Sequence, residues 1–284
     1  MFMEKLFSTP VISVKPDSSV FEALQKMQSK LVKRLVITDG SKPLGIITER
    51  DIDKFLEEDK TARAVDEIPV KHLMQKNVVL VTDGLEDDFY QCASKMENLK
   101  IGSVILVDEN GDLSGIVSRT DLVKSYANVF GGKYLVKDFM STKIVTCRKS
   151  DTLRFALSLI NQNKVSRLVV TDEKGLAVGL ITTNTLLTHS DYFTQGHTRS
   201  RDYLLPLDKE VVVGDLLEKN LVTIGEDEDL AKAASLMIKH KISGVPVLDS
   251  KQNLVGLVSK TDVVKAFSDV MPHEQLKLRY KEMY

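Results

Sequence analysis

One short motif of hydroxyl and acidic residues recurs four times in this chain of 284 residues. It reads glycine, two apolar residues, Thr or Ser, two variable residues and usually aspartate, as in GIITERD at 45–51. The altered copy, GLITTNT at 179–185, has Thr182 but places Thr185 where the aspartate is expected. The three complete copies contain Thr48 and Asp51, Ser118 and Asp121, and Ser259 and Asp262.

The spacing of the hydroxyl and the carboxylate suits two kinds of chemistry. A Ser or Thr followed three residues later by an acidic residue predicts a helix N-terminus, where the hydroxyl accepts a backbone N–H. The same helix N-terminus offers free N–H groups to a phosphate, and its carboxylate can accept two hydrogen bonds from the diol of a ribose. Helix capping alone and nucleotide binding are both open interpretations. Because Thr185 supplies no charged acceptor, we expect any ribose site in the altered copy to be weak or empty.

Basic residues near the motifs are candidates for binding phosphate. Lys33, Arg34 and Arg167 precede the β-rich runs of the first and third copies, whereas Ser103 and Gly244 occupy this position in the other two. Arginine is the better partner for phosphate oxygens because its guanidinium is a planar fork of donors. The alternative is that these residues are solvated surface charges. Three more candidates lie within the motifs: Arg50, Arg119 and Lys260.

The elements that must position the motifs also recur. Each motif follows a β-rich run that ends in aspartate, and a segment with apolar residues at helical spacing precedes that run. In the first copy these apolar residues are Val20, Ala23, Leu24 and Met27, and in the fourth they are Leu230, Ala233, Ala234 and Met237. Short apolar strands are expected to open the repeats at 12–14, 78–81, 144–146 and 221–224. We therefore predict an α/β (α+β) fold made of four βαββα repeats.

The repeats are expected to form two pseudo-symmetric pairs. A repeat of about 55 residues buries too little surface to be stable alone, so pairing through the sheet faces is the natural solution. The glycine pair Gly131-Gly132 suits a hinge between modules at 1–128 and 133–270, and a tail follows at 271–284. The four predicted repeats are 5–57, 68–127, 133–190 and 211–269.

Apolar residues at the start of the opening strands are candidates for a slot that holds a flat base. The alternative is that they belong to the ordinary core, and the two roles are compatible. The candidates are Val11, Ile12, Ile144, Val145, Leu221 and Val222.

Four such repeats resemble CBS domains arranged as two tandem pairs, often called Bateman modules, over about residues 5–270. The layout is similar to that of the regulatory gamma subunit of AMP-activated protein kinase. The resemblance implies a regulatory protein that binds adenine nucleotides (AMP, ADP or ATP) in clefts between paired repeats and transmits the ligand state to a protein partner. It assigns the ribose to Asp51, Asp121 and Asp262, with Thr48, Ser118 and Ser259 beside it.

The sequence supports other ligands and functions less well. S-adenosylmethionine is an alternative ligand because it shares the adenosine, although it lacks the phosphates that Arg34 and Arg167 would bind. A nucleotide-processing enzyme would need paired catalytic carboxylates, a metal set or an activated nucleophile, and none is evident. A purely structural scaffold would not need three aspartates. We therefore expect no catalysis, no required cofactor and no metal site, in a monomeric disc or, alternatively, a homodimer.

Composition argues against several partners. Lys plus Arg number 39 and Asp plus Glu number 40, so the net charge of −1 does not favour nucleic acid or an anionic membrane. No apolar run approaches the ~20 residues of a membrane span. Cys92 and Cys147 lie far apart in the sequence, which argues against a disulfide framework and predicts a reducing cytoplasm.

Overall fold

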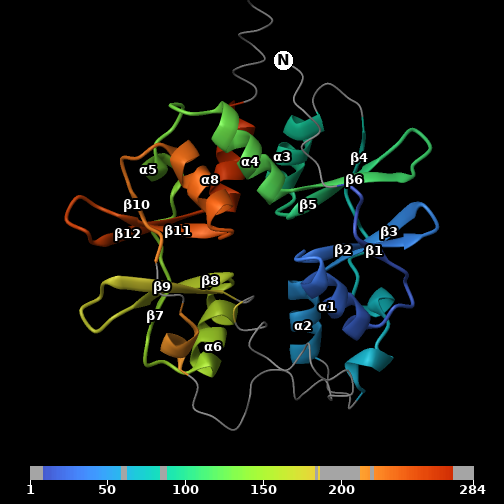
Figure 1. Ribbon diagram of the computed structural model, residues 1–284, viewed down its shortest axis with the longest axis horizontal. Coiled ribbons are helices and arrows are strands. Elements are labelled where there is room, and N and C mark those ends of the chain that lie inside the picture. The colour runs from blue at the N-terminus through green and yellow to red at the C-terminus, as the bar shows by residue number, and fades with distance from the viewer. Residues whose placement is uncertain are drawn as a thin grey trace, which may run out of the picture. The chain divides into compact units, whose positions relative to one another are not determined.

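Four small mixed sheets make up the structure, a computed structural model that describes residues 9–58, 63–83, 88–182, 185, 212–217 and 221–270. Their strand orders are β1-β2-β3, β4-β5-β6, β7-β8-β9 and β10-β11-β12 (Figure 1). In each sheet the first strand pairs parallel with the second, and the second pairs antiparallel with the third. The predicted mixed α/β class is confirmed. The predicted tail at 271–284 lies outside the described residues.

The predicted order of elements holds in repeats one, two and four, and in repeat three as far as the described residues extend. The first repeat contains β1 (Ser13–Val14), α1 (Val20–Ser29), β2 (Arg34–Asp39), β3 (Lys42–Thr48) and α2 (Glu49–Glu58). The second contains β4 (Leu80–Thr82), α3 (Asp88–Asn98), β5 (Ser103–Val107), β6 (Leu113–Ser118) and α4 (Arg119–Val129). The third contains β7 (Thr146–Arg148), α6 (Leu153–Asn163), β8 (Arg167–Thr171), β9 (Ala177–Thr182) and the helical residue Thr185. The fourth contains β10 (Ile224–Gly225), α8 (Leu230–Lys239), β11 (Gly244–Leu248), β12 (Leu254–Ser259) and a helix over 260–270.

The apolar stripes predicted for the helices are buried. The α1 stripe is at most 2% exposed, and the α8 stripe is fully buried. Ser19 caps α1 reciprocally with Glu22, and Asp229 caps α8 through the N–H of Ala231. The opening strands begin one to three residues later than predicted, so β7 starts at Thr146 rather than at 144. Val145, the residue before β7, takes part in the sheet only through its carbonyl, which accepts a hydrogen bond from the Val169 N–H.

The repeats group into two compact units that do not follow chain order. The odd unit combines repeats one and three (Val11–Val78 and Val145–Leu221), and the even unit combines repeats two and four (Met1–Pro10, Val79–Ile144 and Val222–Tyr284). The modules predicted at 1–128 and 133–270 are therefore not the units that Cα proximity defines. The pairing of the sheets of consecutive repeats within these modules stays a prediction.

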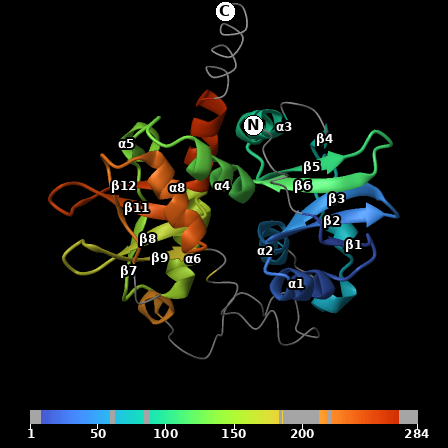
Figure 2. The same ribbon diagram turned by 45° about the horizontal axis from the view of Figure 1, so that its top comes forward.

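The two units differ in their cores. In the even unit α4 lies along α8, as both views show (Figures 1 and 2), and one buried cluster runs through both repeats. Its aromatic centre is formed by Tyr126, Phe130 and Phe267, with neighbouring ring centroids 5.5 and 5.4 Å apart. In the odd unit, the described residues form two separate clusters, one in each repeat.

Three segments that precede an opening strand pack on a different repeat from the one they introduce. We call them crossing segments: 64–75 packs on repeat one, 135–141 on repeat four and 212–217 on repeat three. They contain η1 (Val65–Glu67), η2 (Val70–His72), α5 (Val136–Phe139) and η5 (Val213–Leu216). A fully buried valine anchors each one. The matching backbone bonds run from Val70 N–H to Ser18 C=O (2.8 Å), from Val136 to Glu228 (2.8 Å) and from Val213 to Asp151 (2.9 Å).

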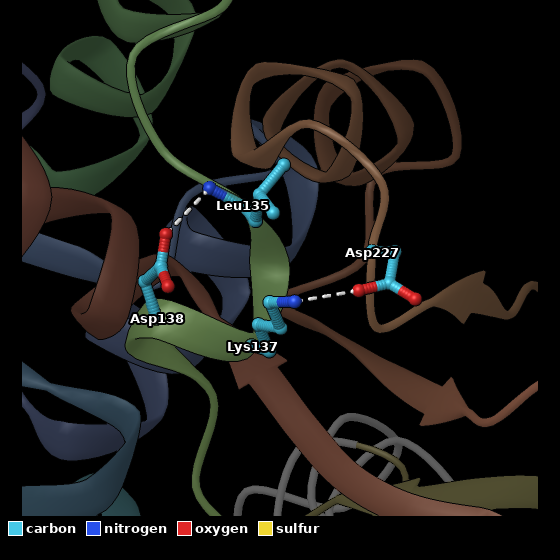
Figure 3. Close-up of polar contacts among 4 residues, drawn as sticks. All are labelled: Leu135, Lys137, Asp138 and Asp227. Atoms are coloured by element: carbon cyan, nitrogen blue, oxygen red, sulfur yellow. Dashed lines mark hydrogen bonds and ion pairs between the residues drawn. The ribbon is translucent and has the colours of Figure 1, made fainter.

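Side chains reinforce two of the crossing segments. Figure 3 shows the second, where the Lys137 ammonium pairs with Asp227 at 2.7 Å and the Leu135 N–H donates to Asp138 at 2.8 Å. An equivalent ion pair of 2.6 Å joins Lys71 to Asp17 on repeat one. The third segment has Gly214 at this position and so has no lysine to pair.

The glycine pair at 131–132 does not form a free linker. The Gly132 N–H donates to the Asp229 carboxylate, and the Leu230 N–H donates to the Tyr134 carbonyl at 2.9 Å. Together with the crossing segment at 135–141, these bonds fasten the connection to repeat four. The segment after α4 is thus bonded to repeat four, and its role as a hinge stays a prediction.

Candidate functional site

Each complete motif forms one hydrogen-bonded turn between a third strand and the helix that follows. In repeat one, Oδ2 of Asp51 accepts from the Thr48 N–H (2.9 Å) and hydroxyl (2.6 Å), and the Asp51 N–H donates back to that hydroxyl (3.3 Å). In repeats two and four, Oδ2 of Asp121 and Asp262 accepts the N–H and hydroxyl of Ser118 and Ser259, each at 2.7 Å. The hydroxyl accepts the predicted backbone N–H in repeat one, and in repeats two and four the aspartate caps the N–H of the serine. All six residues are half-buried.

Capping uses the Oδ2 atom of each aspartate, and the two Oδ1 atoms described next differ in their hydrogen-bond partners. Oδ1 of Asp51 accepts from the Gln75 side chain at 3.0 Å. Oδ1 of Asp121 accepts no hydrogen bond from any residue that the structure describes. Because a cap occupies only Oδ2, capping and ligand binding can use the same aspartate.

The altered turn of repeat three keeps the cap but lacks the charge. The hydroxyls of Thr182 and Thr185 lie 3.0 Å apart, and the Thr185 N–H donates to Thr182 at 3.1 Å. The turn therefore folds like the others without a carboxylate. A ribose diol would find the neutral hydroxyl of Thr185 here in place of a charged acceptor.

Sheet register places the predicted strand cations directly beside the turns of the odd unit. Arg34 pairs with Thr48, and Arg167 pairs with Thr182, across the antiparallel strands. Both arginines are half-buried. In the even unit the equivalent partners are small: Ser103 opposite Ser118 and Gly244 opposite Ser259.

The even unit carries its cations one residue after the hydroxyl instead. The Arg119 guanidinium donates to the Ile101 carbonyl at 2.9 Å, so it folds back on its own repeat. The Lys260 ammonium donates to the Thr120 hydroxyl at 2.9 Å and so joins the turns of repeats four and two. Arg50, the remaining candidate within a motif, is exposed and makes no hydrogen bond with a described residue.

Charges from two repeats act on one another in the odd unit. Desolvation lowers the pKa of Lys33; the Glu49 carboxylate opposes this shift, and Arg167 and Arg34 add to it. Desolvation raises the pKa of the Glu49 carboxyl, which Lys33 and Arg34 partly offset. Lys33 belongs to repeat one and Arg167 to repeat three, so charges from both repeats act on the pKa of Lys33.

The six candidates for an adenine slot are all half-buried. Ile12, Val145 and Val222 pack against the hydrophobic cores, which supports the core role that the sequence left open. The sequence-based set omitted repeat two, where Val79 holds the equivalent place: its carbonyl accepts from Ile105, as that of Ile12 accepts from Val36. Lining of a base by these residues stays a prediction.

Three residues at these turns escaped sequence reasoning. Glu49 lies next to Thr48 in the motif, and its acidic character among basic neighbours was a readable signal. Thr120 carried no such signal, because its partner Lys260 comes from another repeat. Gln75 reaches Asp51 only because a crossing segment docks on repeat one, which no local pattern indicates.

Two features are absent from the described ranges. No group of three or more His, Cys, Asp or Glu side chains there could hold a metal ion. No described helix is long and apolar enough to cross a membrane.

The family model of the CBS domain matches all four repeats, at residues 3–58, 70–128, 136–191 and 213–269. The chain therefore belongs to the CBS domain family.

Known relatives agree with this fold. The protein MJ1225 of Methanocaldococcus jannaschii is 22% identical over 275 residues, which covers 91% of this chain and 95% of MJ1225. Its crystal structure matches with a TM-score of 0.76 at 21% identity, covering 93% of this chain and 98% of that one. A structure from Pyrococcus horikoshii matches with a TM-score of 0.66 at 16% identity, covering 94% and 100%. At these identities the likeness establishes the fold, and function has to be argued from the turns.

Proposed function

We propose that this protein is a cytoplasmic regulatory sensor that binds adenine nucleotides (AMP, ADP or ATP) at the turns of repeats one, two and four. The observation that carries the proposal is the recurrence of one constellation three times. A helix N-terminus, a carboxylate and a hydroxyl lie together, with a cation one residue away or directly across the sheet. Membership of the CBS family supports a regulatory role rather than a catalytic one.

Each part of the turn has a distinct task in this proposal. The aspartate accepts the ribose hydroxyls, because a carboxylate is the strongest acceptor for a diol. The helix N-terminus and its adjacent cation attract phosphate. The apolar residues before the opening strands provide the surface for the base. Binding would then change the state presented to a protein partner, by as much as the ligand's affinities for the two states differ.

S-adenosylmethionine is the alternative ligand, and one observation bears on the choice. It shares the adenosine but carries one carboxylate in place of phosphates, so it offers Arg34 and Arg167 less negative charge than a nucleotide does. The cations beside the turns therefore favour nucleotides.

A thermal-shift panel of AMP, ADP, ATP and S-adenosylmethionine tests the proposal. A ligand at ~100 times its dissociation constant should stabilise the protein by roughly 2.7 kcal/mol. Guanosine and cytidine nucleotides at equal concentration serve as controls. Absence of a shift with every adenosine compound would refute the proposal, and a shift with S-adenosylmethionine alone would replace the nucleotide by that ligand.

A further inference from the structure

The two complete turns of the even unit lead into helices that share one hydrophobic core. One turn leads into α4 and the other into the helix over 260–270. Phe130, directly after α4, and Phe267 of the second helix meet with their ring centroids 5.4 Å apart. Because protein interiors are close-packed, this core positions the two helix N-termini relative to each other. The residues directly after the two aspartates belong to it and are at most 2% exposed: Leu122, Val123, Val263 and Val264.

Lys260 reaches from one of these turns to the other. Its backbone belongs to repeat four, where its N–H donates to the Ser243 carbonyl at 3.2 Å. Its ammonium lies on repeat two, where it donates to the Thr120 hydroxyl at 2.9 Å. Thr120 is the second residue of α4 and lies within the motif, between Ser118 and Asp121. A single lysine side chain therefore spans the distance between the two helix starts.

The cation at the matching place of repeat two has a different direction. Arg119 takes the place of Lys260 there, but its guanidinium donates to the Ile101 carbonyl of its own repeat at 2.9 Å. The positive charge that lies on Thr120 therefore comes from repeat four. Lys260 belongs to one turn through its backbone and to the other through its ammonium.

A phosphate at either helix start would attract this ammonium. Helix N-termini bind phosphate through their N–H groups, and an ammonium nearby adds a charge-assisted hydrogen bond. A phosphate on α4 would keep the ammonium of Lys260 beside Thr120, whereas a phosphate on the helix over 260–270 would draw it back to its own turn. Since the ammonium can occupy one of these places at a time, the two sites would not bind independently.

We propose that the two nucleotide sites of the even unit compete for the Lys260 ammonium, so that a nucleotide bound at one turn weakens the binding of a nucleotide at the other. The coupling is reciprocal, because the free energy that links two binding events is the same in either order. It requires phosphate, since adenosine alone offers no anion to the lysine. This regulation rests on the proposed function and concerns two of its three sites.

Calorimetric titration with AMP tests the coupling in the full chain carrying Asp51→Ala, which keeps the two carboxylates of the even unit. Adding Asp262→Ala or Asp121→Ala gives the affinity of repeat two or of repeat four alone. With both sites intact, the second AMP should bind about 5-fold or more weakly than these single-site affinities predict. Adenosine, which lacks the phosphate, should bind the two sites independently.

Variants of Lys260 test whether its ammonium carries the coupling. Lys260→Met should reduce the coupling to less than about 2-fold, because salt screens solvent-exposed phosphates from each other. Lys260→Arg keeps the charge and should retain the coupling, which guards against a loss caused by misfolding. Lys239→Met removes an exposed charge from α8 of the same repeat, so it is the matched control and should leave the coupling unchanged.

The outcomes separate the coupling from the function on which it rests. If neither single-site protein binds AMP, the proposed function fails in the even unit and the coupling fails with it. If both bind AMP and their affinities reproduce the two-site titration, only the coupling is overturned. Coupling that is positive, that is equally strong with adenosine, or that survives Lys260→Met would likewise overturn the competition for Lys260.

Discussion

The even and odd units hold their repeats together in different ways. In the even unit one hydrophobic core runs through both repeats, and α4 packs along α8. In the odd unit the described residues form two separate cores, and the interaction that links Lys33 to Arg167 is repulsive. Hydrophobic burial stabilises a unit whether or not ligand is present. The two units therefore differ in whether a shared hydrophobic core joins their repeats.

The turns repeat this contrast. The even unit has two complete motifs with small residues opposite, and it is spanned by the Lys260–Thr120 contact. The odd unit has one complete motif, one altered motif and an arginine opposite each. The comparison predicts two similar sites in the even unit and one dissimilar site in the odd unit.

The largest expected effect is the loss of a site in the even unit. Asp121→Ala or Asp262→Ala removes a charged acceptor worth about 1.5–3 kcal/mol, so the affinity of that site should fall roughly 10- to 150-fold. Thr185→Ala in the odd unit should scarcely affect binding. Calorimetry on the three variants measures the difference.

The capping-only alternative gives a different result for the same variants. It predicts a stability loss of about 0.5–2 kcal/mol for each aspartate variant with unchanged nucleotide affinity. Denaturant unfolding beside the titrations separates the two. Wild-type binding by both aspartate variants, or damage confined to Thr185→Ala, would contradict the site assignment.

The second prediction concerns the docking of a crossing segment in the odd unit. A Cβ at Gly45 would lie 2.8 Å from Met74 Sδ and 3.0 Å from the Gln75 carbonyl, which two backbone bonds to Ile46 hold in place. Gly45→Ala should therefore destabilise the protein by about 1–3 kcal/mol, the usual cost of overpacking. Gly131→Ala is the control, because its nearest atom, Asp229 Oδ2, is 3.9 Å away. Equal unfolding midpoints for the two variants would show that the segment does not pack on β3.

The third prediction makes the odd unit resemble the even one. Thr185→Asp restores the missing carboxylate beside Thr182, the residue opposite Arg167, on a turn that already keeps its cap. We expect a fourth nucleotide site, about 10-fold or more stronger than the residual binding of the wild-type turn. The stoichiometry in calorimetry should rise from three to four. An unchanged stoichiometry would mean that the aspartate alone does not define a site.

Sequence reasoning succeeded where the determining contacts are local. The motif spacing implied a capped turn because Thr48 and Asp51 are three residues apart and meet within one helical turn. The apolar periodicity of α1 and α8 identified their buried faces for the same reason. These features depend on neighbours in the chain, so their pattern is visible without the fold.

Contacts between distant residues were not predictable in this way. The glycines at 131–132 suggested a hinge, but Asp229, nearly a hundred residues later, binds the Gly132 N–H. Gln75 reaches Asp51 through a crossing segment whose partner repeat no local pattern identifies. The grouping of repeat one with repeat three likewise depends on contacts between residues that are distant in the chain.

The smallest expected effect distinguishes the crossing segments that carry an ion pair from the one that carries Gly214. Lys137 bonds to Asp227, which raises the pKa of Lys137 above its usual 10.5. A raised lysine pKa means that the folded state binds the proton more tightly, so the stabilisation is present at neutral pH and is lost as the pH rises through the folded-state pKa. Because both side chains are substantially exposed, Lys137→Met should lower the melting temperature by no more than about 2 °C at pH 7.

Two conditions should erase that difference. Above the pKa of Lys137 the wild-type ammonium loses its charge, so wild type and Lys137→Met should converge in melting temperature. Salt at about 1 M shortens the screening length to roughly 3 Å and should bring them together at neutral pH as well. Asp227→Asn in the Lys137→Met background should add nothing, since the pair is already broken. A difference that survives both high pH and high salt would assign the contribution of Lys137 to packing of its aliphatic stem, and the crossing segments would then differ in shape rather than in charge.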